Sequence, residues 1–429
     1  MTGSWAERDA AVVWHGFTQM ASYVDNAPVV VDRAEGRELI DVDGKRYLDA
    51  ISSLWVNTLG HRVPELDAAL AEQIGKVAHS TMLGNGNTVV VELAEALAAV
   101  VPVDRPHFLF ASDGAAAVEQ ALKIAFQFFT NQGVSGRTRY LAFGGAYHGD
   151  TVGSLSLGDG GFGTDVFDPL RFPVLRAPGY ADADCYRRAA AMVDEDGNTL
   201  AAVVLEPLVQ GAAGMAMAPR EGLGDLADAC ARHGVLLIAD EVATGFGRTG
   251  TLFACEQAGV RPDLLCVGKG LTGGYLPMSA TAASQRVYDA FLGEDLSERT
   301  FYHGHSYSGN ALAAAVALRH LQLIGEWSVL ENVRARSEQL AKALDAEAAD
   351  KPVVADIRLR GLMGGVELVP PRQNLRWGRR VCAAAVERGV LLRPLGDVVV
   401  LMPPLTITVE EIERIVSVLA EAIDEVTTA

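Results

Sequence analysis

The chain has 429 residues, with 36 lysines and arginines against 54 aspartates and glutamates, which gives a formal net charge of −18. The 49% hydrophobic content is typical of a folded protein, and the negative charge makes nucleic acid and anionic membranes unfavourable partners. Its five scattered cysteines lack the spacing of a zinc site or a disulfide framework, and no secretory leader or membrane-spanning segment is evident, so we expect a cytoplasmic protein.

The first two thirds of the chain predict alternating strands and helices. Residues 29–50 predict a β-hairpin, and residues 66–101 have the apolar spacing of amphipathic helices. From residue 106 to 277, short apolar runs alternate with helical stretches, which is typical of a parallel sheet covered on both faces. The expected strands are 107–110, 138–144, 200–206, 235–241 and 263–268, with helices that include 115–129 and 222–233.

The C-terminal part has a different pattern. A long helix is predicted from residue 310, extended segments around 353–366 and 398–402, and a final helix from residue 409. We therefore expect an α/β fold with a mostly parallel central sheet in a large domain, residues 61–319. A smaller α+β domain is expected to combine residues 1–60 with residues 320–429.

Two features resemble ligand sites without the context that such sites need. The segment 158–163 matches the GxGxxG pattern, but residues 164–169 make a poor helix, so we expect a mobile glycine-rich loop rather than a nucleotide site. His148 has no second ligand at helical or hairpin spacing. We expect it to be a loop histidine that hydrogen-bonds locally, and we expect no metal site.

Three predicted strands of the central sheet end in polar residues. Asp240 ends one strand, Lys269 follows the next strand, and Ser112 begins a glycine-containing turn that leads into the helix 115–129. The carboxyl ends of such strands line the ligand crevice, and a helix N-terminus binds phosphate. A lysine, an acid and a phosphate pocket are what pyridoxal 5′-phosphate (PLP) needs. Taken alone, a lysine in the position of Lys269 is usually a surface residue, and Asp240 is more often a helix cap or a salt-bridge partner. Their order along the chain favours a PLP site formed by both.

Two longer segments make the sequence recognisable. They are DEVATGFGRTG at 240–250 and PDLLCVGKGLTGG at 262–274, and with them the chain resembles the class III (omega) aminotransferases of fold type I over essentially its whole length. Within that class, it is most similar to the branch that converts 8-amino-7-oxononanoate to 7,8-diaminononanoate in biotin biosynthesis. Supporting segments are 14–20, 52–55, 147–151, 303–307, 393–396 and 402–404.

The resemblance implies roles for residues at the cofactor ring. Lys269 matches the lysine that binds PLP covalently and moves the substrate proton, and Asp240 matches the partner of the pyridine nitrogen. Val242 matches the residue beneath the ring and Tyr147 the aromatic residue stacked over it. Glu206 matches an acid near the ring.

The phosphate end of the cofactor is assigned in the same way. Gly114 and Ala115 match the phosphate loop, although the family commonly has a serine where Ala115 stands, so backbone N–H groups and Ser112 are expected to compensate. His305 is also placed at the cofactor, and Ser306 matches a hydroxyl that reaches the phosphate from a neighbouring subunit. The resemblance thus implies a homodimer with shared active sites.

For the substrates, Arg393 matches the arginine that binds the carboxylate of the keto acid. The residues that the resemblance places at the substrate are Phe17, Leu54, Trp55, Tyr147, Asp150, Lys269, Gly304 and Arg393.

Four positions depart from the common pattern of this branch. The family often has tryptophan at Leu54, tyrosine at Phe17 and Val400, and proline at Gly16. These departures lie in the region that receives the amino donor, which is S-adenosylmethionine in most of the family and lysine in a subset. The Phe17 and Ser-Leu-Trp features are closer to the lysine-using subset, and the donor remains open.

Three other functions are alternatives to this one. Another class III aminotransferase with a different amine and keto acid would share every cofactor residue. A cofactor-free binding protein of this fold is disfavoured because both Lys269 and Asp240 are present. An aminomutase of the glutamate-semialdehyde type is disfavoured by the segments around Trp14 and Arg393.

Overall fold

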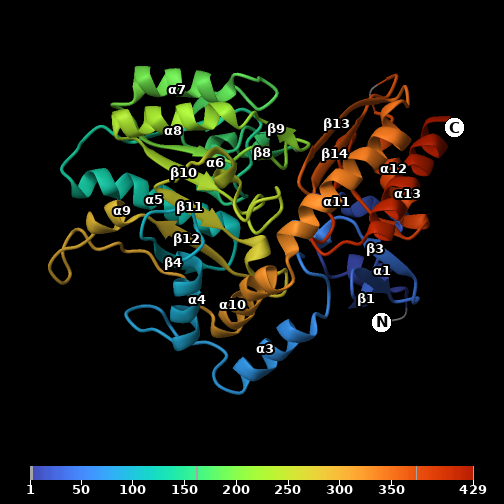
Figure 1. Ribbon diagram of the computed structural model, residues 1–429, viewed down its shortest axis with the longest axis horizontal. Helices are drawn as coiled ribbons and strands as arrows, with labels where there is room; N and C mark the ends of the chain where they lie inside the picture. The colour runs from blue at the N-terminus through green and yellow to red at the C-terminus, as the bar shows by residue number, and fades with distance from the viewer. Residues whose placement is uncertain (1–2, 161–162, 373, 429) are drawn as a thin grey trace.

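The computed structural model describes residues 3–160, 163–372 and 374–428 (Figure 1). Gly161 and Phe162 of the predicted glycine-rich loop, together with Met1 and Thr2 of the N-terminal segment, lie outside the described residues. Within the described ranges, no helix is both long and apolar enough to cross a membrane.

A seven-stranded sheet forms the centre of the molecule. All of its strands run parallel except β12, which is antiparallel to both of its neighbours. The five predicted strands are present, so the expected α/β architecture with a mostly parallel sheet is confirmed. In sheet order the strands are β4 (His107–Ala111), β12 (Ser279–Ala283), β11 (Leu264–Val267), β10 (Leu236–Asp240), β7 (Leu200–Leu205), β5 (Arg139–Phe143) and β6 (Leu175–Ala177).

Helices cover both faces of this sheet (Figure 1). Alternate strand residues such as Val203 and Leu237 pack with α7 (Cys185–Asp196) and α8 (Glu221–His233). The intervening residues, such as Val204, pack with α5 (Gly114–Asn131) on the opposite face. Strands buried on both faces explain the continuous apolar runs in the sequence.

The remaining helices lie beside the large sheet, at its junction with the C-terminal part of the chain, or beside the strands near the two ends of the chain (Figure 1). They are α1 (Trp5–Ala10), the irregular α2 (Ser52–Trp55), α3 (Pro64–Ile74), α4 (Thr88–Ala98), α6 (Val152–Leu157), α9 (Gln285–Asp289), α10 (Ala311–Glu326), α11 (Val329–Leu344), α12 (Trp377–Glu387) and α13 (Val409–Thr428).

Two four-stranded sheets lie beside the C-terminal helices, near both ends of the chain (Figure 1). The predicted hairpin at residues 29–50 is in fact three antiparallel strands, and the third of them pairs in parallel with β15 from the C-terminal part. The strands are β1 (Val31–Glu35), β2 (Glu38–Asp41), β3 (Arg46–Asp49) and β15 (Val390–Leu391) in one sheet; β13 (Val354–Arg360), β14 (Met363–Leu368), β17 (Val398–Leu401) and β16 (Arg393–Leu395) in the other; and the small pair β8 (Val209–Gln210) and β9 (Ala216–Met217).

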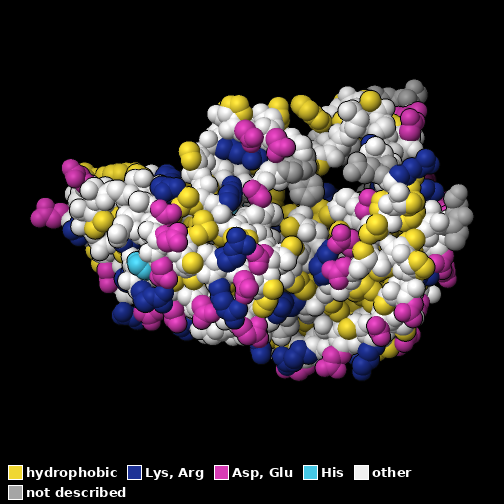
Figure 2. All heavy atoms as spheres, turned by 90° about the horizontal axis from the view of Figure 1, so that it is seen from above, with side chains coloured by type: hydrophobic (Ala, Val, Ile, Leu, Met, Phe, Trp, Pro, Cys, Tyr) yellow, Lys and Arg dark blue, Asp and Glu magenta, His cyan; other side chains and the backbone are white. Residues whose placement is uncertain are grey.

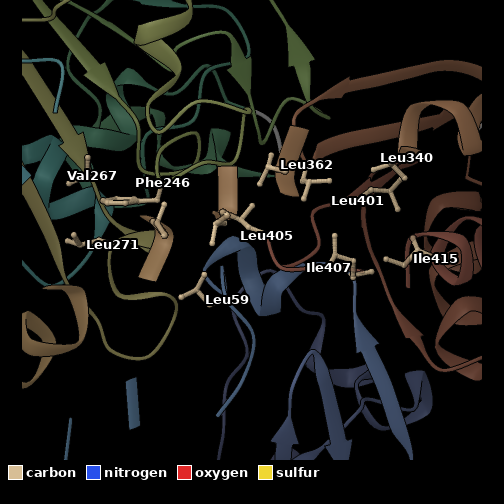
Figure 3. Close-up of a cluster of buried hydrophobic side chains, with 14 of the residues drawn as sticks. Leu59, Phe246, Val267, Leu271, Leu340, Leu362, Leu401, Leu405, Ile407 and Ile415 are labelled. Carbon is tan, nitrogen blue, oxygen red and sulfur yellow. The ribbon is translucent and has the colours of Figure 1, made fainter. Parts of the chain in front are cut away.

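One hydrophobic core connects the large sheet with the C-terminal helices (Figure 3). It includes Val267 and Leu271 on the sheet side, Leu405 at the junction, and Ile407 and Ile415 beyond it. The turn that follows β11 and carries Lys269 therefore packs against aliphatic side chains of this core.

At the surface, basic side chains are interspersed with acidic ones (Figure 2).

Candidate active site

A cavity of about 700 Å³ opens at the carboxyl ends of the central strands. Asp240 is the last residue of β10, Lys269 lies two residues beyond β11, and Glu206 directly follows β7. Neighbouring parallel strands end at the same edge of the sheet, and this brings the three side chains together. The residues predicted from the sequence that line this cavity are Leu54, Trp55, Ser112, Gly114, Ala115, Tyr147, Asp150, Glu206, Asp240, Val242 and Lys269.

Five predicted residues do not line the cavity within one chain. His305 comes nearest, because its Nε2 lies 3.0 Å from Oγ of Ser112. Phe17 is exposed, and Gly304 and Ser306 lie in an exposed stretch of the loop that contains His305. Arg393 is exposed on β16, and no carboxylate in the described part of the chain pairs with it.

Lys269 occupies a left-handed backbone conformation, with a φ of 41°, at the start of a short 3₁₀ turn, Lys269–Thr272. Its Nζ lies 5.2 Å from the centre of the Trp55 ring. Burial lowers the pKa of the Lys269 ammonium, while the negative charges of Asp240 and Glu206 oppose that shift. A lysine with a lowered pKa supplies the neutral amine that acts as a nucleophile or a base.

Asp240 is buried and its carboxylate is held on both oxygens. One oxygen lies 2.7 Å from Nδ1 of His148, and the other accepts a hydrogen bond of 3.1 Å from the backbone N–H of Val242. The expectation of a local hydrogen bond for His148 was wrong, because its partner lies 92 residues away. The nitrogen Nε2 of this buried histidine has no partner among the described residues. The carboxylate is therefore fixed in orientation at the cavity wall.

Glu206 lies on the opposite side of Asp240 from Lys269, and it is hydrogen-bonded to two loops. Its carboxylate accepts hydrogen bonds of 3.1 Å from the backbone N–H groups of Tyr147 and Gly211. The hydroxyl of Tyr147 donates a hydrogen bond of 2.8 Å to Asp150. Burial raises the pKa of the Tyr147 phenol, so this hydroxyl stays protonated at neutral pH and remains a donor.

The titration of Glu206 leads to a prediction for the cofactor-free protein. Burial raises the pKa of Glu206 from 4.5 to about 7, with Asp240 adding to the shift and His148 opposing it. The resulting contribution to stability is present below the unfolded pKa and is lost as the pH rises through about 7. Glu206→Gln does not ionise, so between about pH 5 and pH 8 its free energy of unfolding should rise by about 2.5 kcal/mol relative to that of the parent. Urea unfolding across this range would test it; parallel curves for the two proteins would contradict it.

The N-terminus of α5 forms one end of the cavity. Asp113 caps this 18-residue helix through a hydrogen bond of 2.9 Å from the Ala116 N–H, and the first-turn N–H groups of Gly114 and Ala115 have no intrahelical acceptor. The Ser112 hydroxyl lies 3.0 Å from the Asp113 carboxylate as well as from His305. This end of the cavity therefore offers backbone N–H groups to a phosphate.

These residues fit PLP. A Cβ on Gly114 would lie 2.6 Å from Cγ1 of Val242, so only glycine lets the helix start approach the residue beneath the expected ring position. The same cavity contains a lysine of lowered pKa and a buried carboxylate. Those groups would bind the cofactor covalently and face its ring nitrogen, respectively.

Gly114→Ala should therefore weaken PLP binding about tenfold or more and destabilise the protein by about 1–3 kcal/mol, because the added methyl overpacks against Val242. A titration with PLP followed by visible absorbance, together with thermal unfolding, would measure both effects. Gly224→Ala on α8 is the matched control: its Cβ would meet nothing within 4 Å, so we expect unchanged PLP binding and equal or slightly higher stability. Equal behaviour of the two variants would contradict the packing argument.

Some cavity residues were missed by the sequence analysis. His148 was the chief omission, and Thr272, Tyr275 and Met278 also line the cavity after the turn that carries Lys269. The consecutive glycines Gly273 and Gly274, both with positive φ, reverse the chain there and return it to the cavity. The glycine pair four residues after the lysine was the signal that could have pointed to this return.

Comparisons with known proteins agree with this geometry. The sequence profile described as aminotransferase class-III matches residues 19–423. The adenosylmethionine-8-amino-7-oxononanoate aminotransferase of Nitratidesulfovibrio vulgaris is 49% identical to this chain, over 98% of the chain and 81% of its own length. The enzyme of the same name from Geobacter sulfurreducens is 40% identical, over 98% of this chain and 97% of its own length.

Solved structures give the same result. The crystal structure of the Methanocaldococcus jannaschii enzyme of that name superposes with a TM-score of 0.94 at 38% identity, covering 98% of each chain. A PLP-bound amine transaminase from an uncultivated Pseudomonas species has a TM-score of 0.91 at 33% identity, covering 96% of this chain and 98% of its own. With a profile match over nearly its whole length and a cavity that fits the cofactor, this chain belongs to the class-III aminotransferases, which are PLP-dependent enzymes of fold type I.

Proposed function

We propose that the enzyme converts 8-amino-7-oxononanoate to 7,8-diaminononanoate in biotin biosynthesis, with S-adenosylmethionine or lysine as amino donor. The observation that carries this proposal is a cavity with Lys269 and Asp240 in its wall, in a chain whose relatives at 40–49% identity are named for that reaction. The reaction runs in two halves, and one site and one base can serve both substrates.

Each residue of the site has a separate role in the proposed reaction. Bound PLP supplies an electron sink that stabilises negative charge on the reacting carbon of the substrate. The Nζ amine of Lys269 would remove the proton from the reacting carbon of the donor, and in the second half-reaction the same group would deliver a proton to the carbonyl carbon of the keto acid. Asp240, oriented by His148, would keep the ring nitrogen protonated. Val242 and Tyr147 would pack against the ring, and the start of α5 would hold the phosphate.

The keto acid has a carboxylate at the end of a long alkyl chain, and the cavity wall offers apolar surface to that alkyl chain. Trp55 and Leu54 provide apolar surface, and Asp150 lies near the end of Tyr147. We assign the carboxylate to Arg393, whose exposed guanidinium has no carboxylate partner in the described part of the chain.

Arg393→Ala should then raise the KM for the keto acid about tenfold to a hundredfold while changing the KM for the donor less than threefold, because only one substrate loses its bidentate partner. Steady-state kinetics with each substrate varied in turn would measure the two KM values. Arg372→Ala, also an exposed arginine of the C-terminal part, is the control and should match the parent. Equal increases for both substrates would reject Arg393 as the residue that binds the carboxylate.

We also propose a cytoplasmic homodimer in which each site is completed by the partner. This proposal is supported by Phe17, Gly304 and Ser306, which the resemblance assigns to the site and which are exposed in the single chain. Residues 1–60 and 320–429 would form the smaller domain, supported by the pairing of β3 with β15, and residues 61–319 the larger. Sedimentation of the PLP-loaded enzyme would test the dimer.

The substrate assignment is tested by mixing the PLP-loaded enzyme with 8-amino-7-oxononanoate and either S-adenosylmethionine or lysine. Mass spectrometry should detect 7,8-diaminononanoate with one of these donors. Turnover of other amine and keto acid pairs without any reaction of 8-amino-7-oxononanoate would overturn the assignment in favour of a different class III aminotransferase.

A further inference from the structure

The segment that carries Trp55 has an unusual backbone. Ser52, Ser53 and Trp55 have φ values of 54°, 60° and 65°, the left-handed region that residues with side chains seldom occupy. Three such residues within four positions persist only if surrounding interactions hold them. One of these is the hydrogen bond of 2.7 Å from the Ser52 hydroxyl to the carbonyl of Met402.

The main support is the carboxylate of Asp49, the last residue of β3. It is fully buried, and both oxygens accept hydrogen bonds of 2.8 Å from the Ser53 N–H. Its side-chain partners are the Ser53 hydroxyl, at 3.3 Å, and Nε2 of His61, at 2.9 Å, and no lysine or arginine in the described ranges forms an ion pair with it. A buried carboxylate needs such donors; here they fix the left-handed turn.

The hydrogen bonds around His61 identify which ring nitrogen carries the proton. Oδ1 of Asn57 accepts a hydrogen bond of 2.7 Å from the Gly60 N–H, so the Asn57 amide NH₂ must face Nδ1 of His61, 3.0 Å away. Nδ1 is then the acceptor, and the proton lies on Nε2, which donates to Asp49. The chain of bonds Asn57–His61–Asp49–Ser53 is thereby directional and fully satisfied.

This network ends at the active site. Trp55 is buried in the cavity wall with its ring 5.2 Å from Nζ of Lys269, and a Cβ on Gly211 would lie 2.9 Å from that ring. The backbone around Asn57 lies against the glycine turn that follows Lys269, since a Cβ on Gly274 would be 3.0 Å from the Asn57 Cα. A change in the turn would therefore move the Trp55 ring relative to Lys269.

We propose that Asp49 and His61 are positioning residues for the reaction: by holding the left-handed Ser52–Trp55 turn, they place the Trp55 ring over Lys269 and against the substrate. This inference rests on the proposed function for its substrate, while the placement of Trp55 beside Lys269 does not depend on which keto acid reacts.

Two substitutions of His61 separate its two hydrogen bonds. His61→Gln places an amide NH₂ at the position of Nε2 and keeps the donor to Asp49, whereas His61→Asn places an acceptor at the position of Nδ1 and loses that donor. We expect His61→Asn to raise the KM for the keto acid about tenfold with kcat changed less than threefold, and His61→Gln to remain within threefold of the parent. His233→Asn, which breaks an exposed 2.9 Å pair with Asp194, is the control and should change neither.

A double-mutant cycle shows whether the effect passes through Trp55. In a Trp55→Ala background, His61→Asn should cause no further increase in KM, because the group that it positions is already absent. Independent, additive effects of the two substitutions would overturn the proposal, as would equal KM values for His61→Asn and His61→Gln.

A measurement without substrate separates this inference from the substrate assignment. The visible circular dichroism of bound PLP reports the asymmetry of its surroundings, and we expect His61→Asn to reduce it to the level of Trp55→Ala. If the parent rejects 8-amino-7-oxononanoate, the proposed function fails while this signal still decides the positioning role. If His61→Asn does not fold, the isosteric Asp49→Asn, which leaves one acceptor oxygen where the carboxylate has two, replaces it; a folded Asp49→Asn protein with parental circular dichroism would overturn the proposal.

Discussion

Lys269→Ala should abolish the transaminase, with a loss of about 10⁴-fold or more in kcat, because one side chain provides both the covalent attachment of PLP and the base that moves the substrate proton. Lys269 has a left-handed backbone conformation, and burial lowers the pKa of its ammonium. No other lysine among the described residues lines the cavity.

The Lys269→Ala experiment combines kinetics with a covalent readout. After borohydride reduction, mass spectrometry should find PLP attached to the parent and not to the variant. Lys342→Ala, at an exposed position on α11, is the matched control and should retain both attachment and turnover. A Lys269→Ala protein that keeps PLP attached and turns over substrate would remove the basis of the proposed mechanism.

Asp240→Asn should have the second-largest effect, a decrease of about 10³-fold in kcat, because the neutral amide no longer stabilises a protonated ring nitrogen. The substitution keeps the shape of a side chain whose oxygens contact His148 and the Val242 N–H, so the loss would report charge rather than packing. Single-turnover rates with the donor alone would isolate this step.

Two controls accompany Asp240→Asn. Asp194→Asn, at an exposed ion pair, should leave the single-turnover rate unchanged. PLP binding to the Asp240→Asn protein should weaken far less than turnover does. A variant with parental single-turnover rates would show that the ring nitrogen does not depend on this acid.

The sequence was sufficient to predict five of the seven strands of the central sheet and the residues at their carboxyl ends. Val203 and Leu237 belong to continuous apolar strands, and such strands are recognisable without a partner. β12 was missed because its residues, Ser279–Ala283, are small and have little β-propensity; the space between β4 and β11 determines its conformation. Asp240 and Lys269 could be placed at one edge because parallel strands share their direction.

Contacts between distant parts of the chain could not be predicted. The bond between His148 and Asp240 joins residues that are far apart, and nothing in the local sequence around His148 indicates it. The left-handed conformation of Trp55 could not be predicted either, since the neighbouring Ser52 and Ser53 are hydrogen-bonded to the distant Met402 carbonyl and to Asp49. Local patterns report propensity, whereas these features come from tertiary contacts.

The pairing of β3 with β15 has a consequence for biosynthesis on the ribosome. All strands of the central sheet have been synthesised once residue 283 has left the ribosome. The partner of β3, in contrast, lies about 340 residues further along the chain and is synthesised much later. At about 5–20 residues per second, this delay is roughly 20–70 s, during which the edge of β3 is unpaired. Nascent chains released before residue 390 would thus expose an open strand edge to chaperones or to other nascent chains, even with the larger sheet already formed.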